Sequence, residues 1–108
     1  ALSYHAVLIH IPTESEMPTR AEMLRWHGLQ RVLERTLNQT GVGELDGDEW
    51  GGGECTIYCY GPNADDLWHA LRPHVLAAHT PSGTFITKRY GRAGEAMEVR
   101  VSLEGDGE

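Results

Sequence analysis

Apolar positions recur with the period of a β-strand in five places along the chain. The stretch from Tyr4 to Ile11 is rich in aliphatic and β-branched residues, and Pro12 ends it. From Met97 to Leu103 apolar and polar residues alternate, which places one apolar stripe on a single face of a strand. The predicted strands cover residues 4–11, 42–49, 54–60, 84–90 and 97–103, of which 42–49 has the weakest pattern.

Apolar spacings of three and four residues predict a first helix over residues 19–39. Thr19 is its expected N-cap, because Glu22 follows in the register of a capping box, and Gly41 provides a C-terminal stop. Gly28 interrupts the helix at a cost of about 1 kcal/mol relative to alanine, which predicts close packing at this position. The buried stripe is predicted to contain Trp26, Leu29, Leu33 and Leu37.

A second helix is predicted over residues 63–78. Asn63 is its expected N-cap, and two aspartates in the first turn suit the positive end of the helix dipole. Pro73 removes one backbone donor inside this helix, so the sequence predicts a kink or a break near Arg72. The apolar stripe of this helix is Leu67, Leu71 and Val75.

The resulting order of elements is strand, helix, strand, strand, helix, strand, strand. This order predicts an α+β domain of the ferredoxin-like βαββαβ type with an extra C-terminal strand that pairs as a hairpin. Both helices then cover one face of an antiparallel sheet, and the first and third strands are central. We expect a single domain over residues 1–104 and a disordered tail over 105–108.

Composition narrows the class of protein. A chain of 108 residues with 40% hydrophobic and 23% charged residues is typical of one globular domain. The formal net charge of -7 argues against nucleic acid as a partner, because phosphate binding requires a basic surface. It is compatible with a basic protein partner, a cationic ligand or a divalent ion, and also with a role in solubility alone.

Cellular location is predicted from the cysteines and from the apolar runs. Cys55 and Cys59 are four residues apart in a predicted strand, so their Cα atoms lie roughly 13 Å apart, beyond the reach of a disulfide. Two reduced cysteines favour the cytoplasm, where we expect them in the core as small apolar side chains. The N-terminal run Ala6–Ile9 is too short for a signal sequence or a membrane span.

An acidic, glycine-rich segment invites a metal-binding interpretation that its spacing does not support. A calcium loop starting at Glu44 has Cys55 in place of its terminal glutamate, and one starting at Asp46 ends on Ile57. The histidines also lack zinc-site spacing. We therefore expect no metal and no cofactor, although a looser carboxylate site remains an alternative. The favoured interpretation is a solvated hairpin turn whose negative rim contains Asp46, Asp48, Glu49 and Glu54.

The same segment carries a resemblance. Gly43–Pro62, extended loosely through Asp65, Leu67 and Pro73, combines an acidic Asp-Gly turn, a Gly-Gly-Gly-Glu run, a Tyr-Gly-Pro strand end and an acidic helix start. This combination resembles a pattern of small bacterial proteins that have no known activity, and it covers about a third of the chain. The resemblance implies a ferredoxin-like domain and provides no catalytic residues.

Strand periodicity also predicts a surface. If the apolar residues of the two central strands lie beneath the helices, the alternate residues form an open face of the sheet. Tyrosine and leucine gathered on an open face indicate a partner, and we expect a homodimer or a basic protein partner. RNA-binding domains also carry aromatics there, but the acidity of this chain argues against RNA. The predicted surface contains Tyr4, Leu8, His10, Thr56, Tyr58 and Tyr60.

Two classes of function remain. The favoured one is a non-catalytic binding or oligomerisation module that uses the open face. The alternative is a small enzyme with a pocket on the same face near the acidic segment. There His10 and either Glu49 or Glu54 would exchange protons, and Arg89 would anchor a substrate carboxylate. The absence of a catalytic motif favours the first class.

Overall fold

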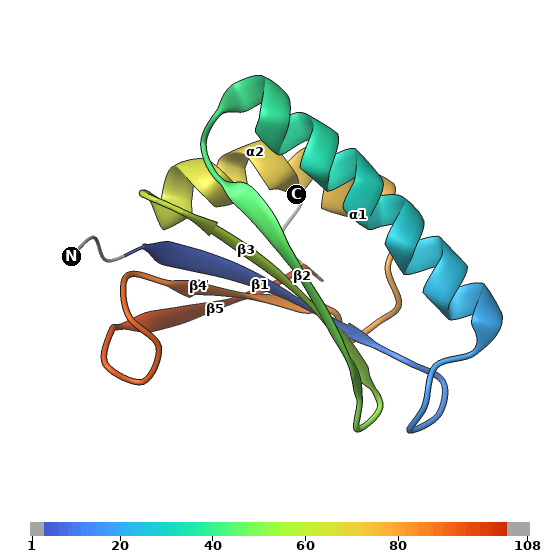
Figure 1. The fold of residues 1–108 in the computed structure, drawn as a ribbon. Coiled ribbons are helices and arrows are strands. Elements are labelled where there is room, and N and C mark those ends of the chain that lie inside the picture. The colour runs from blue at the N-terminus through green and yellow to red at the C-terminus, as the bar shows by residue number, and fades with distance from the viewer. Residues whose placement is uncertain (1–3, 104–108) are drawn as a thin grey trace.

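The computed structural model describes residues 4–103, so the tail predicted over 105–108 lies outside the described residues. Two helices lie on one side of a five-stranded sheet with strand order β2-β3-β1-β4-β5, and every neighbouring pair is antiparallel (Figure 1). The α+β prediction is confirmed, while the order βαββαββ is not strictly that of a canonical ferredoxin-like domain. The elements are β1 (His5–Pro12), α1 (Arg20–Thr40), β2 (Glu44–Gly51), β3 (Glu54–Gly61), α2 (Ala64–Ala77), β4 (Phe85–Arg89) and β5 (Glu98–Ser102).

Helix α1 begins and ends where its sequence predicts. The Thr19 hydroxyl accepts a hydrogen bond from the Glu22 amide at 3.0 Å, and the Glu22 carboxylate accepts one from the Thr19 amide at 2.8 Å. Hydrogen bonds from the backbone amides of Thr19 and Glu14 lower the pKa of Glu22. Gly41 ends the helix with a left-handed backbone (φ 74°). Neither of the described helices is both long and apolar enough to cross a membrane.

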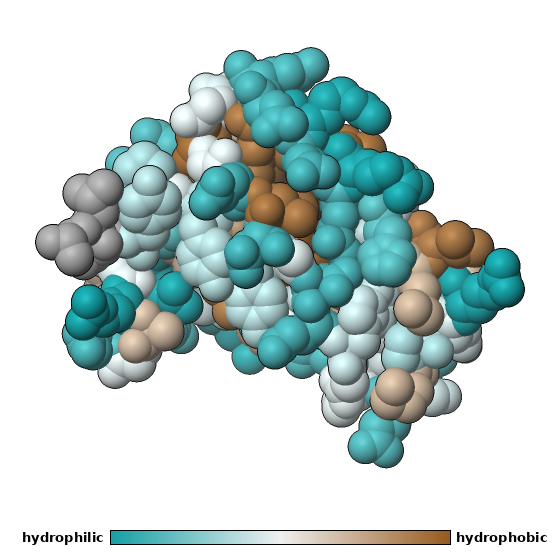
Figure 2. Space-filling model, in the orientation of Figure 1, coloured by the Kyte–Doolittle hydropathy of each residue, from teal (hydrophilic) through white to brown (hydrophobic). Residues whose placement is uncertain are grey.

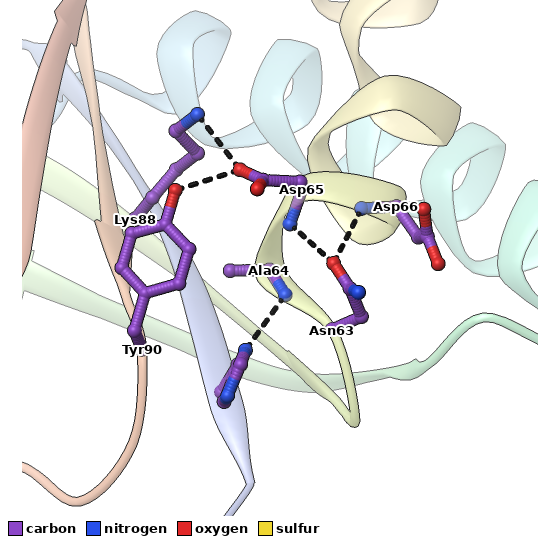
Figure 3. A network of polar contacts seen from close by, with 7 residues as sticks. Asn63, Ala64, Asp65, Asp66, Lys88 and Tyr90 are labelled. Atoms are coloured by element: carbon purple, nitrogen blue, oxygen red, sulfur yellow. Dashed lines mark hydrogen bonds and ion pairs between the residues drawn. The ribbon is translucent and has the colours of Figure 1, made fainter.

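Helix α2 departs from its prediction at one point. The Asn63 side chain caps it by accepting hydrogen bonds from the Asp65 and Asp66 amides, as expected (Figure 3). The break or kink expected near Arg72 does not interrupt the helix, which continues through Pro73 to Ala77. Pro73 lies on the exposed side, while two buried residues, Leu71 and Val75, anchor the helix on either side of it.

The core lies between the helices and the sheet, and the prediction for the two central strands is confirmed. Ile9 of β1 pairs with Ile57 of β3, and both are fully buried. Gly28 corrects an expectation: a Cβ built there would meet only the end of the Arg31 side chain, at 3.9 Å, so nothing packs closely against it. The main core residues are Val7, Ile9, Ile11, Trp26, Leu29, Leu33, Leu37, Cys55, Ile57, Cys59, Leu67, Trp68, Leu71, Val75 and Ile86.

The acidic segment forms the strand that was weakly predicted over residues 42–49, so most of it is not a solvated turn. Strand β2 extends to Gly51, and the reversal is made by Gly52 and Gly53, whose φ angles are 62° and 81°. Positive φ at both turn residues matches a two-residue hairpin with the twist of its strands. The register shifts between Leu45 and Gly47, so a bulge lies at Asp46. The glycines therefore serve the sharp reversal that the sequence predicts.

Candidate binding surface on the open sheet face

The face of the sheet opposite the helices, here called the open face, is defined by the pairing register. Leu8 lies between Tyr58 and Thr87, and His10 lies between Thr56 and Phe85. Figure 2 shows a hollow on this side of the molecule, between the projecting ends of the two hairpins (compare Figure 1). The open face contains Glu44, Glu49, Glu54, Thr56, Tyr58, Tyr60, Ala6, Leu8, His10, Phe85, Thr87, Arg89, Glu98 and Arg100.

A hydrogen-bonded row crosses three strands of the open face. His10 Nδ1 lies 2.5 Å from Glu54 Oε2, and His10 Nε2 lies 3.0 Å from Thr87 Oγ1. Thr56 also donates to Glu54 Oε2, at 3.1 Å. The His10 side chain is only 16% exposed, whereas that of Glu54 is 38% exposed. The arrangement fits a histidine whose Nδ1–H donates to the carboxylate and whose Nε2 accepts from the Thr87 hydroxyl.

An aromatic stack holds the other side of His10. The rings of His10 and Phe85 are nearly parallel, with centroids 4.3 Å apart. The guanidinium carbon of Arg100 lies 3.7 Å from the centroid of the Phe85 ring. The surface predicted from the sequence did not include Phe85, Thr87 or Arg100, although the alternation in residues 97–103 already indicated that Arg100 points away from the apolar stripe.

Tyr58 is held by a carboxylate of the neighbouring strand. Its hydroxyl donates to Glu49 Oε1 at 2.5 Å. This hydrogen bond, with smaller effects of burial and nearby charge, raises the pKa of Tyr58 to about 12. Tyr58 thus lies on the open face as predicted, but as a fixed side chain beside Leu8 rather than a free one.

Arg89 does not lie near the predicted acid–base pair. Its guanidinium carbon is 5.9 Å from the Tyr60 ring centroid, and its Nε donates to the Gly91 carbonyl. Arg89 and Tyr60 both pair with Ala6, which is fully buried although it lies on the open face. Since Ala6 is four residues from His10 along β1, roughly 13 Å separates these two positions. The structure therefore does not bring Arg89 to His10.

The acidic residues separate into different environments: Asp46 and Glu49 are exposed, as predicted, whereas Asp48, with a side chain 21% exposed, is not mostly solvated. Asp48 lies on the helix side of β2, where its Oδ2 accepts a hydrogen bond from Gln30 at 2.7 Å and lies 3.3 Å from His27 Nε2. Asp46 is exposed at the bulge. Glu49 and Glu54 accept the hydrogen bonds from Tyr58 and His10. Strand pairing causes the difference, because it gives each alternate carboxylate a distinct neighbour.

Two shallow depressions flank these carboxylates. One, of about 330 Å³, is lined by Glu49, Glu54 and Thr56 together with the turn at Gly51. The other, of about 350 Å³, is lined by Asp46, Glu49, Tyr58 and Tyr60 among others. Among residues 4–103 no group of three histidine, cysteine, aspartate or glutamate side chains could hold a metal ion.

Charge is divided across the open face. Glu44, Glu49 and Glu54 lie on β2 and β3, whereas Arg89 and Arg100 lie on β4 and β5. Glu98, which pairs with Arg89, adds one carboxylate to the basic half. The central strand β1 separates the two halves and carries Leu8 and His10.

A second polar network, on the helix side, holds β4 against α2. Asp65 Oδ1 accepts hydrogen bonds from the Tyr90 hydroxyl at 2.6 Å and from Lys88 Nζ at 3.0 Å (Figure 3). These bonds, the one from Tyr90 foremost, lower the pKa of Asp65. His5 Nδ1 accepts a hydrogen bond from the Ala64 amide at 3.0 Å. Each group has a partner within the fold, so this network is structural.

Comparison of the chain with protein-family models, with curated proteins and with solved structures finds no match.

Proposed function

We propose that the open face pairs two copies of the chain, so that the protein acts as a binding and oligomerisation module. The division of charge across the open face supports this proposal most directly. We also infer an extended ferredoxin-like class, supported by the order β2-β3-β1-β4 of the first four strands in the sheet.

A two-fold axis near Leu8 makes the open face complementary to itself. The axis runs along β1, between the two facing sheets. Because β1 is the middle strand, a half-turn about this axis lays β2 and β3 of one copy over β4 and β5 of the other. Glu49 and Glu54 then face the half that carries the second copy's arginines, and Leu8 and Tyr58 meet at the centre. Apolar contact at the centre with complementary charge at its rim is the usual composition of a specific interface.

Replacement of Tyr58 by aspartate tests this pairing. A specific dimer buries roughly 1,200 Å² or more, and an aspartate at its centre leaves a buried charge beside Glu49. We expect sedimentation to show a dimer for the wild type and an increase of at least about tenfold in the dissociation constant for Tyr58→Asp.

Met23→Asp is the matched control, because Met23 is 38% exposed on α1, on the helix side of the sheet. This variant should dimerise as the wild type does. A wild-type monomer at millimolar concentration, or equal weakening by both substitutions, would contradict the proposal.

The contact between His10 and Glu54 favours a second candidate, a small enzyme that uses acid–base chemistry. Glu54 orients the imidazole, so that Nε2 faces the Thr87 hydroxyl and can accept a proton by way of it, and a depression lies beside the carboxylate. Arg100, through its stack on Phe85, takes the place of Arg89 as the candidate anchor for a substrate carboxylate, because the Phe85 ring itself stacks on His10.

Hydrolysis of p-nitrophenyl acetate tests this candidate without knowledge of the natural substrate. We expect His10→Gln and Glu54→Gln each to lower the rate by at least about tenfold, since each removes part of the oriented base. His27→Gln is the control, because His27 forms another histidine–carboxylate pair, with Asp48 on the helix side. An equal loss of hydrolysis rate in His27→Gln would show that any histidine side chain of the protein hydrolyses the ester. That result would exclude this candidate function.

A further inference from the structure

Strand β5 is an edge strand that the helices leave largely uncovered. It lies at the end of the strand order, and its main contacts are with β4. Its neighbour Met97 is 66% exposed and Val99 is 37% exposed. Met97 and Val99 lie on the same face of β5 as Val101, because alternate residues of a strand share a face. That face is the helix side of the sheet, since Val101 pairs with the buried Ile86. The sheet thus extends its apolar face beyond the layer of helices.

The backbone of β5 has a defined set of groups that face outwards. The Tyr90 amide donates to the Met97 carbonyl at 3.0 Å, so Met97 directs its backbone towards β4. By the alternation of an antiparallel ladder, Val99 and Val101 do the same. Glu98 and Arg100 therefore direct their amide and carbonyl groups away from β4. An edge of this kind is a template for another strand.

We propose that β5 pairs in antiparallel fashion with β5 of a second copy, with Glu98 opposite the partner's Arg100. Pairing requires that outward-facing residues lie opposite each other, which leaves three registers for a two-fold axis placed between residues 98 and 100. One places Glu98 opposite itself and another places Arg100 opposite itself, and like charges directly opposite each other are unfavourable. The third forms the pair of Glu98 and Arg100 twice, related by the two-fold axis. Charge complementarity thus selects one register and one occupant.

The selected register also buries the apolar stripe. Val99 lies opposite its own counterpart, and Met97 lies opposite the partner's Val101. The two stripes form a continuous apolar band across a joined sheet, and their exposed area is removed from water. An interface of one short strand is smaller than the roughly 1,200 Å² of a typical specific complex, so we expect a weak, concentration-dependent association.

A cysteine at position 99 reports this register directly. Val99 forms a non-hydrogen-bonded pair with its counterpart, with Cα atoms about 4.5 Å apart, within disulfide geometry. Val99→Cys should therefore form a covalent dimer under mild oxidation. Met97→Cys is the matched control, because its two copies lie about four residues, or roughly 13 Å, apart in this register. The control should cross-link at least tenfold more slowly, although Met97 is the more exposed position. Equal or faster cross-linking of the control would overturn the proposal.

In the Val99→Cys protein, charge reversal tests the register of β5, and Tyr58→Asp separates edge pairing from pairing through the open face. Arg100→Glu places Glu98 and a new carboxylate opposite each other and should abolish cross-linking. The double change of Glu98→Arg with Arg100→Glu restores opposite charges at the edge and should restore cross-linking. The double change exchanges the two charges and leaves the net charge of the basic half of the open face unchanged, so Tyr58→Asp is the variant that separates the two interfaces. Tyr58→Asp should leave cross-linking unchanged. Loss of cross-linking with Tyr58→Asp, or no rescue by the double change, would overturn pairing through β5.

Discussion

Replacement of Gly61 by alanine is expected to destabilise the fold by about 3 kcal/mol, at the upper end of what overpacking costs. A Cβ at Gly61 would overlap the carbonyl oxygen of Val42. A Cβ at Gly43 would likewise overlap the carbonyl oxygen of Tyr60. These are backbone atoms, so rotation of a side chain cannot relieve the overlap. The start of β2 must instead move away from the end of β3. Urea denaturation, followed by circular dichroism, measures the change.

Gly28→Ala is the control for this prediction and should have the opposite sign. It makes the same chemical change within α1, where the new Cβ meets only the mobile end of Arg31. Alanine is favoured over glycine in a helix by about 1 kcal/mol, so this variant should be more stable than the wild type. Similar destabilisation by both substitutions would contradict the structural account of these two glycines.

The two cysteines are expected to be almost inert towards a thiol reagent in the folded protein. Both are free and fully buried, and burial is the main reason that the pKa of each thiol rises to about 12. The carboxylates of Asp48 and Glu54 raise the pKa of Cys55 further. Because the thiolate is the reactive form, reaction with Ellman's reagent at pH 8 should require unfolding. We expect a rate at least about a thousandfold below that in guanidinium chloride.

Gly61→Ala provides a control for the thiol prediction. By increasing the unfolded population, it should accelerate the reaction of both cysteines, whereas Gly28→Ala should slow it. A thiol that reacts rapidly in the folded wild type would show that Cys55 or Cys59 is accessible. It would also reopen the catalytic role that their buried, acidic setting argues against.

The sequence predicted the elements where local periodicity was strong. The capping box at Thr19, the stripe from Trp26 to Leu37 and the alternation in β3 each depend on residues a few positions apart. Of the kink or break expected near Arg72, the break does not occur, and the close packing expected at Gly28 is absent, for a shared reason. Both were inferred from the residue alone, whereas neighbouring packing at Leu71 and Val75, and open space beside Gly28, decided the outcome.

The surface was predicted only in part, because its contacts join distant segments. Periodicity placed His10, Tyr58 and Tyr60 on one face. It could not show that Glu54 and Thr87, which are 44 and 77 residues from His10, meet the two nitrogens of its ring.

By itself, the sequence determined which residues of each strand and helix share a face, since period two and period 3.6 are properties of the local backbone. Only the tertiary structure decided which strands are neighbours and in what register they pair. The register turned Asp48 towards α1, separated Arg89 from His10 and placed Arg100 over Phe85. It also left β5 at an edge with Glu98 and Arg100 facing outwards, because the order of strands in a sheet is set by packing between segments far apart in the chain.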